Sequence, residues 1–238
     1  MNTKLTIFGF PRSGTKLLAS IYEQQGYHNF GEFFNPFSTS IVENLPIPKS
    51  ARLSIEEQKA EQNRREKIST VSNYVIKNRI VKDRYSKFKN FIDLEPSIVT
   101  CWMSDIQFMS TLLPAMGDRF ILCPRRKNKL DQLLSYCVSK HNNNFDGEII
   151  SKPVVVDIVF LDNTFCHFYK TERLQDTFVK LDMGRYIDFD LLITGQEDLG
   201  FDYKVTTKDQ HTDLESLIIN IDEVKNRIEE LKNFSQMF

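Results

Sequence analysis

The sequence is poor in the residues that make tight turns, with 9 glycines and 8 prolines among 238 residues. Proteins built from many short β-strands need such turns frequently, so this scarcity argues against a β-sandwich and favours long helices. Hydrophobic residues make up 41% of the chain and charged residues 26%, a balance typical of a globular protein rather than a disordered or fibrous one. The length of 238 residues fits one large domain.

The chain also lacks an excess of either charge, because 31 Lys and Arg residues stand against 32 Asp and Glu residues. A general nucleic-acid-binding protein normally carries a basic excess, so we expect no nucleic-acid partner and only local anion sites. The longest apolar runs, such as residues 154–156, are far shorter than the roughly 18 residues of a membrane span, and the N-terminal apolar stretch is too short for a signal peptide. We therefore expect a cytoplasmic protein without a membrane span, and we leave open whether it forms a homo-oligomer.

Metal-binding and disulfide patterns are absent from the sequence as well. The four cysteines are widely spaced with no CxxC pair, and the four histidines show no HxH or HExxH spacing. Both observations argue against a zinc site, and the cysteine spacing argues against a disulfide framework. The sequence thus predicts no bound metal.

The sequence does contain an alternation of strand-like and helix-like segments. Residues 5–8 form an apolar run, and the helical pattern after it places Leu17, Leu18 and Ile21 on one face before Gly26 ends it. Strands that alternate with helices indicate an α/β fold with a central parallel sheet flanked by helices. The pattern predicts further strands at 27–30, 97–102, 119–123 and 186–193, and helices at 107–116, 128–140, 157–180 (interrupted) and 222–233.

One segment interrupts this alternation. The run Ser54-Ile55-Glu56-Glu57 fits a capping box, and the charged stretch that follows has the composition of a long solvated helix. We interpret residues from about 50 to 90 as a helical excursion from the sheet, so that residues 1–238 form a single domain.

A glycine turn joins the first strand to the first helix, with the sequence Gly9-Phe10-Pro11-Arg12-Ser13-Gly14-Thr15-Lys16. Consecutive backbone N–H groups at a helix N-terminus make a concavity that binds phosphate or sulfate. Arg12 and Lys16 add charge to this turn, and the hydroxyls of Ser13 and Thr15 add donors. The nearest general motif is the nucleotide P-loop, G-x-x-x-x-G-K-[ST], but this chain has Thr-Lys after the second glycine, which disfavours an ATPase or kinase. The alternative is a turn that merely joins strand to helix.

A second basic cluster follows the strand predicted at 119–123. Arg125, Arg126 and Lys127 lie at the start of the next helix, and Ser135 lies about two turns further on. Three cations at a helix N-terminus oppose the helix dipole, so the arrangement costs stability unless an anion binds there. The alternative is a solvated basic turn.

The first motif resembles the phosphosulfate loop of a known enzyme family. The run Pro11-Arg12-Ser13-Gly14-Thr15, followed by Leu17-Leu18, is similar to the loop of sulfotransferases that use 3′-phosphoadenosine 5′-phosphosulfate (PAPS). Its form is most like the bacterial trehalose-sulfotransferase branch and related short phage and bacterial proteins. The resemblance implies a P-loop-like α/β fold, PAPS as co-substrate without a metal, and transfer of a sulfuryl group to a hydroxyl of a carbohydrate or small molecule.

The same resemblance assigns roles to the residues of both clusters. It implies that the segment from Arg12 to Lys16 binds the 5′-phosphosulfate, with Arg12 also acting in catalysis. It implies that Arg125 or Arg126, together with Ser135, binds the 3′-phosphate, although strict counting back from the serine gives Lys127. Further nucleotide contacts would come from the C-terminal third, with Lys204 and Lys208 as candidates.

The candidate general base is Glu32, in the segment Gly31-Glu32-Phe33-Phe34-Asn35-Pro36, which resembles the base-carrying segment of the trehalose type. The alternatives are Asp105, His28, or a Glu32 that is simply a surface residue at a turn. The run Asp188-Phe189-Asp190 matches the DxD of glycosyltransferases, but three letters are weak evidence and we expect no function there. Two other functions stay open, a kinase-like P-loop protein and a non-catalytic PAP-binding module.

Overall fold

The computed structural model describes residues 4–33, 96–101, 119–142, 152–205 and 214–235, together with Lys82 and Ser86. The predicted helix at 107–116, the capping box at 54–57 and all but those two residues of the predicted excursion lie outside the described residues. The described helices and strands are β1 (Lys4–Phe8), α1 (Thr15–Gln24), β2 (His28–Asn29), β3 (Ser97–Cys101), β4 (Phe120–Arg125), α7 (Lys129–His141), α8 (Ile158–Lys180), β5 (Gly184–Asp188), α9 (Phe189–Ile193), η3 (Glu215–Leu217) and α10 (Ile221–Ser235).

The five strands form one sheet in the order β2-β3-β1-β4-β5, and every pair in it is parallel. Leu5 of β1 lies opposite Ile98 of β3 on one side and opposite Phe120 of β4 on the other. The central strands are near-continuous apolar runs because both faces of a parallel sheet are covered. The α/β class and the parallel sheet predicted from the sequence are confirmed.

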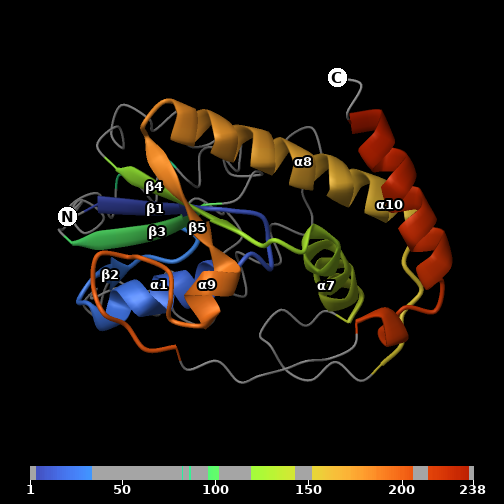
Figure 1. Ribbon diagram of the computed structural model, residues 1–238, viewed down its shortest axis with the longest axis horizontal. Helices are drawn as coiled ribbons and strands as arrows, with labels where there is room; N and C mark the ends of the chain where they lie inside the picture. The colour runs from blue at the N-terminus through green and yellow to red at the C-terminus, as the bar shows by residue number, and fades with distance from the viewer. Residues whose placement is uncertain are drawn as a thin grey trace.

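Helices cover both faces of this sheet (Figure 1). One face packs against α1 and α9, where Ile7, Leu122 and Leu192 share a buried cluster with the apolar side of α1. On the other face Phe8 makes an edge-to-face contact with Phe178 of α8, with ring centroids 5.4 Å apart. Neighbouring residues of a strand point to opposite faces, so Ile7 and Phe8 enter different layers of the core. No described helix is long and apolar enough to cross a membrane.

Two of the predicted elements differ from the structure. The strand expected at 186–193 is wrong in its second half, because β5 ends at Asp188 and α9 begins at Phe189. The Asp188 carboxylate accepts hydrogen bonds from the N–H groups of Asp190, at 2.9 Å, and of Leu191, at 3.2 Å, and so caps the new helix. The helix expected to be interrupted within 157–180 is continuous, since α8 contains neither Gly nor Pro and Asp157 caps its first turn.

Candidate anion-binding site

The glycine turn and the basic cluster lie at the point where the chain reverses its direction across the sheet. From β1 the chain passes through α1 to β2 on one side, whereas from β4 it passes through α7 and α8 to β5 on the other side. Adjacent strands whose connections diverge in this way leave a crevice between their carboxyl ends, and α/β proteins bind their ligands there. The loop after β1, residues 9–14, and the loop after β4, residues 126–128, both lie at this carboxyl edge of the sheet (Figure 1).

The loop after β1 is held tightly by the core. Phe10 is 5% exposed, and its ring makes edge-to-face contacts with Phe168 and Tyr136, at centroid distances of 5.1 and 5.2 Å. A Cβ atom on Gly9 would lie 2.7 Å from the Oγ of Ser13, so any larger residue here would displace the Ser13 hydroxyl. Arg12 has φ 67°, an uncommon conformation for a residue with a side chain. Backbone strain of this kind is characteristic of ligand-binding loops.

Helix α1 begins without a side-chain cap. Gly14 occupies its N-cap position with φ 90°, and the first turn contains no acidic residue. By contrast, the N-termini of α7, α8 and α9 are each capped by an Asn or Asp side chain. The first-turn N–H groups of α1, together with the positive end of its dipole, are therefore suited to an anion supplied from outside the helix.

Helix α7 brings the two predicted clusters into contact. The Nε of Arg12 donates a hydrogen bond to the Oγ of Ser135 at 2.9 Å, and the side chain of Gln132 donates to the carbonyl oxygen of Pro11 at 3.3 Å. Both Ser135 and Gln132 are buried. The sequence suggested two separate anion sites, whereas the structure joins Arg12 of the first to Ser135 of the second.

Arg126 faces the same loop. Burial first, and the positive charge of Arg12 second, lower the pKa of Arg126, while Asp190 and Asp131 partly offset this effect. Burial also lowers the pKa of Arg12. Bound anionic groups offset the repulsion between two like charges in a partly buried site.

Polar atoms without partners mark this site as well. Four buried side-chain polar atoms have no hydrogen-bond partner in the part of the chain that the structure describes, and two of them are the Oγ of Ser13 and the Nε of Arg126. Buried polar groups are nearly always satisfied, so each exception requires an explanation. Ser13 is 1% exposed and its Oγ lies on the inner side of the loop, close to Gly9. Each of these atoms is a potential hydrogen-bond donor to a bound oxyanion.

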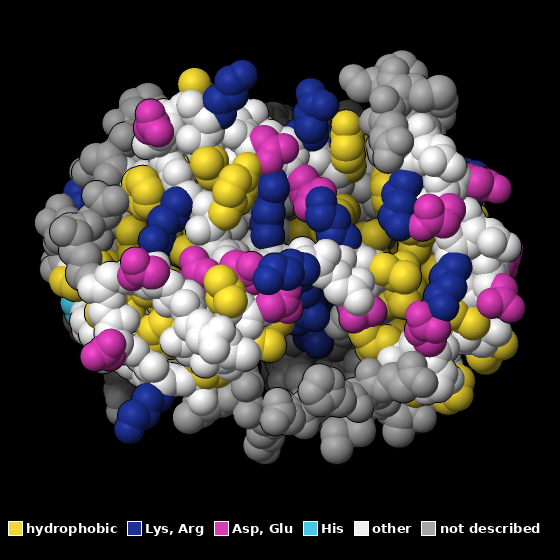
Figure 2. Space-filling view, viewed as in Figure 1, with side chains coloured by type: hydrophobic (Ala, Val, Ile, Leu, Met, Phe, Trp, Pro, Cys, Tyr) yellow, Lys and Arg dark blue, Asp and Glu magenta, His cyan; other side chains and the backbone are white. Residues whose placement is uncertain are grey.

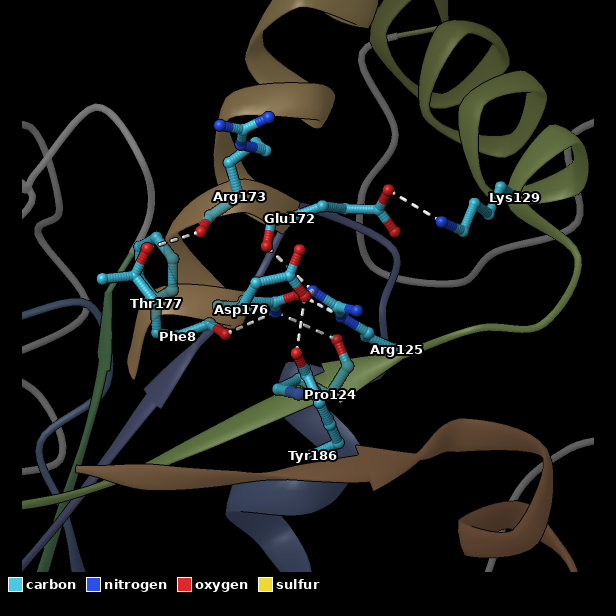
Figure 3. Close-up of polar contacts among 10 residues, drawn as sticks. Phe8, Pro124, Arg125, Lys129, Glu172, Arg173, Asp176, Thr177 and Tyr186 are labelled. Carbon is cyan, nitrogen blue, oxygen red and sulfur yellow. Dashed lines mark hydrogen bonds and ion pairs between the residues drawn. The ribbon is translucent and has the colours of Figure 1, made fainter. Parts of the chain in front are cut away.

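The guanidinium of Arg125 lies against α8 (Figure 3). Its guanidinium donates to the side chains of Gln175 and Asp176 at 2.8 and 2.7 Å, and to the carbonyl oxygen of Glu172 at 2.8 Å. The ring of Tyr186 lies 4.1 Å from its Cζ. Because neighbouring side chains at a strand end point in opposite directions, Arg125 and Arg126 serve different faces of the sheet. Of the two arginines that the sequence left as alternatives, Arg126 is the one beside the loop.

Three lysines near the two loops are less favourably placed for binding an anion there. Lys127 forms an ion pair with Asp188 at 3.3 Å, and Lys129 pairs with Glu172 at 2.8 Å. Lys16 lies exposed in the first turn of α1, and the adjacent Thr15 is buried. On the face drawn in Figure 2, Lys and Arg side chains alternate with Asp and Glu side chains, so the overall charge balance of the sequence also holds locally there.

The structure describes two of the three candidate bases, Glu32 and His28. Glu32 follows β2 at the same carboxyl edge of the sheet and is half-buried, and the carbonyl oxygen of the preceding Gly31 accepts a hydrogen bond from the N–H of Thr100 at 2.7 Å. His28 is exposed on β2. Asp105 lies outside the described residues, as does Lys208, whereas Lys204 is described and exposed.

Two residues near the site were not expected from the sequence. Gln175 of α8 is 2% exposed and its side chain donates to the carbonyl oxygens of Phe8, at 2.9 Å, and of Pro124, at 3.4 Å. It thereby ties the ends of β1 and β4, from which both loops start, and nothing in its sequence context marks it. Phe189 packs against both Gly14 and Arg126, and its only signal was the DxD run that contains it.

No family model matches this chain, and no curated protein matches it either. Among the described residues, no group of three or more His, Cys, Asp or Glu side chains is placed to hold a metal ion. The fold and the site together define an α/β protein with a parallel five-stranded sheet and a candidate oxyanion site at its carboxyl edge.

Proposed function

We propose that this protein is a PAPS-dependent sulfotransferase that acts on a hydroxyl group of a carbohydrate or other small molecule. The observation that carries the proposal is the glycine loop at the uncapped N-terminus of α1, with the guanidinium groups of Arg12 and Arg126 beside it. The motif resemblance of the segment from Pro11 to Leu18 supplies the class of ligand, an adenine nucleotide with a 5′-phosphosulfate and a 3′-phosphate.

The residues present fit an oxyanion ligand of this kind. The unpaired Oγ of Ser13 and the uncapped N-terminus of α1 provide neutral donors on one side of the loop. The guanidiniums of Arg12 and Arg126 provide charge, and a guanidinium binds a phosphate or sulfate with two parallel hydrogen bonds. A site with both kinds of donor suits a ligand that carries more than one anionic group.

In the proposed reaction the oxygen of the acceptor hydroxyl forms a bond to sulfur, and the bond from sulfur to the 5′-phosphate oxygen breaks. By analogy with phosphoryl transfer, preorganised cations and N–H groups stabilise the charge that develops on the transferred group and on the leaving phosphate. Arg12 and the first turn of α1 would supply this stabilisation. Glu32 would accept the proton of the hydroxyl as general base.

The order of residues after Gly14 favours this function over that of a nucleotide kinase. In a nucleotide P-loop the residue after the second glycine is the lysine that reaches the phosphates. Here that residue is Thr15, which is 3% exposed and has its methyl group 3.1 Å from the position of a Cβ on Gly9. The following Lys16 is exposed. A kinase-like function therefore lacks its phosphate-binding lysine at the expected position.

Ligand binding by the purified protein tests the proposal directly. The desulfated product PAP should raise the melting temperature well above the effect of AMP, because only PAP presents a 3′-phosphate to Arg126. At a ligand concentration 100 times Kd, the stabilisation is about 2.7 kcal/mol. Stabilisation by ATP with Mg²⁺ and not by PAP would replace this function with the kinase-like one.

Two matched arginine variants refine the test. Arg126→Ala should weaken PAP binding about 10- to 100-fold, since a charge-assisted hydrogen bond contributes about 1.5–3 kcal/mol, and should leave AMP binding nearly unchanged. Arg125→Ala should instead lower the melting temperature and leave PAP binding unchanged, since Arg125 contacts α8. Equal losses of PAP and AMP affinity in Arg126→Ala would remove Arg126 from the 3′-phosphate site.

The role of Glu32 separates an enzyme from a binding module. Glu32→Gln should lower turnover roughly 10²- to 10⁴-fold, the usual contribution of a positioned general base, without weakening PAP binding. Release of PAP from labelled PAPS, measured with a panel of sugars and phenols, reports turnover. Full activity of Glu32→Gln would move the search to Asp105 and His28. Tight PAP binding by the wild type without turnover on any acceptor would favour the non-catalytic module.

A further inference from the structure

Phe189, the first residue of α9, lies between the glycine loop and the guanidinium of Arg126. A Cβ atom on Gly14 would lie 2.2 Å from Cδ2 of Phe189 and 2.5 Å from its Cε2, so the ring packs directly against the backbone of the loop. The Cζ of Arg126 lies 4.1 Å from the centroid of the same ring, which is the distance of a cation–π contact. Phe189 therefore touches both the glycine loop and the guanidinium that faces it.

The two aspartates that flank Phe189 hold the segment that carries Arg126. The Oδ2 of Asp190 accepts a hydrogen bond from the backbone N–H of Lys127 at 3.1 Å. The Lys127 ammonium forms an ion pair with Asp188 at 3.3 Å, and Asp188 also caps α9. The backbone next to Arg126 is thus held by the two aspartates, and the Phe189 ring between them contacts the Arg126 side chain.

From these contacts we infer that the Asp188-Phe189-Asp190 turn is the positioning element of Arg126 and sets the direction in which its guanidinium meets an oxyanion at the loop. This inference rests on the proposed function, because it assigns a role within the same site. The DxD run then acts through an arginine and not as a metal-binding motif.

An aromatic ring suits this role better than a carboxylate would. A ring face orients a guanidinium but accepts none of its in-plane N–H bonds, so those donors remain for the ligand. Arg125 differs from Arg126 in this respect, because it donates hydrogen bonds to Gln175, Asp176 and a carbonyl oxygen of α8. A side chain that is already oriented also loses less conformational entropy when the anion binds.

A double-mutant cycle tests the inference, with Kd for PAP measured by calorimetry. Phe189→Leu should weaken PAP binding about 2- to 30-fold, the range expected for a cation–π contact of about 0.5–2 kcal/mol. In the Arg126→Ala background the same change should alter Kd less than 2-fold, because the group that Phe189 positions is gone. Phe189→Tyr keeps the ring face and should restore wild-type affinity.

A matched control separates positioning from general stability. Phe178→Leu removes a half-buried aromatic ring on the opposite face of the sheet, and it should lower the melting temperature without changing Kd for PAP. Equal losses of affinity for Phe189→Leu with and without Arg126 would overturn the inference, and so would failure of Phe189→Tyr to restore binding.

The proposed function and the inference fail in different ways. If PAP does not bind the wild type, the proposed function fails, and inorganic sulfate becomes the probe for the same cycle. Coupling between Phe189 and Arg126 in sulfate binding would then support the inference alone. If neither PAP nor sulfate stabilises the wild type, both are overturned.

Discussion

Adding one methyl group to Gly14 should damage the protein in a way that can be calculated from the structure. An L-residue in the left-handed conformation costs about 1–2 kcal/mol, and Gly14 has φ 90°. The added Cβ would also lie 2.2 Å from the ring of Phe189, and overpacking of this kind costs about 1–3 kcal/mol more. Gly14→Ala should therefore lower the free energy of unfolding by about 2–5 kcal/mol.

Gly26 provides a matched control for this prediction. Its φ is 86°, nearly that of Gly14, but a Cβ there meets no described atom within 4 Å. Gly26→Ala should therefore show the backbone cost alone. In urea denaturation the two variants should differ by about 1–3 kcal/mol, which corresponds to about 2–12 °C in melting temperature for a protein of this size. In a Phe189→Ala background Gly14→Ala should cost no more than Gly26→Ala.

The reasoning would be refuted if Gly14→Ala and Gly26→Ala unfolded at the same urea concentration. That result would mean that the Phe189 ring does not pack against the loop, and it would also remove the basis for its role in positioning Arg126. An equal cost of Gly14→Ala in the wild-type and Phe189→Ala backgrounds would refute it in the same way.

Three further predictions concern single residues. Arg12→Gly should be more stable than Arg12→Ala by about 1 kcal/mol in urea denaturation, because the φ of 67° at this position favours glycine. Glycine variants are usually the less stable of such a pair, so a more stable Ala variant would contradict the loop conformation. One of the four thiols should react with a thiol reagent in the native protein and none in Cys166→Ser, because the other three cysteines are buried; fast reaction of a second thiol would contradict that burial. Burial alone would raise the pKa of Asp188, but hydrogen bonds from Leu191, Lys127 and Asp190 hold this pKa below its usual value. The ionised carboxylate therefore stabilises the fold above about pH 4, and this stabilisation is lost as the pH falls. Asp188→Asn keeps the capping oxygen and should make acid unfolding less steep, whereas an unchanged acid transition would show that this carboxylate does not contribute.

The local structure around the site could be predicted from the sequence. The apolar run before Gly9 and the helical spacing of Leu17, Leu18 and Ile21 correspond to β1 and α1, and Asn128 caps α7 where the pattern placed the start of a helix. These features depend on neighbours within a few residues, and local spacing and capping chemistry are visible in a linear sequence. The continuation of the last strand to residue 193 was wrong because the capping role of Asp188 competes with the strand propensity of the residues after it.

Sequence spacing could not decide which arginine belongs to the site. Arg125 and Arg126 are adjacent and chemically identical, and only the pleat of β4 and the position of α8 send one toward Asp176 and the other toward Phe189. The same holds for the contact between Arg12 and Ser135, which are 123 residues apart and meet because β1 and β4 are neighbours in the sheet.

The sequence by itself therefore determined the α/β class, the glycine loop and the residues from which an anion site could be built. The tertiary structure decided that Arg126 rather than Arg125 lies beside the loop and that Phe189 contacts both the loop and the guanidinium of Arg126. The physical reason is the order β2-β3-β1-β4-β5, which places the carboxyl ends of β1 and β4 side by side and lets α9, at the end of β5, pack against the loop from below the sheet (Figure 1). Strand order depends on how distant segments share a core, and no local pattern in the chain records it.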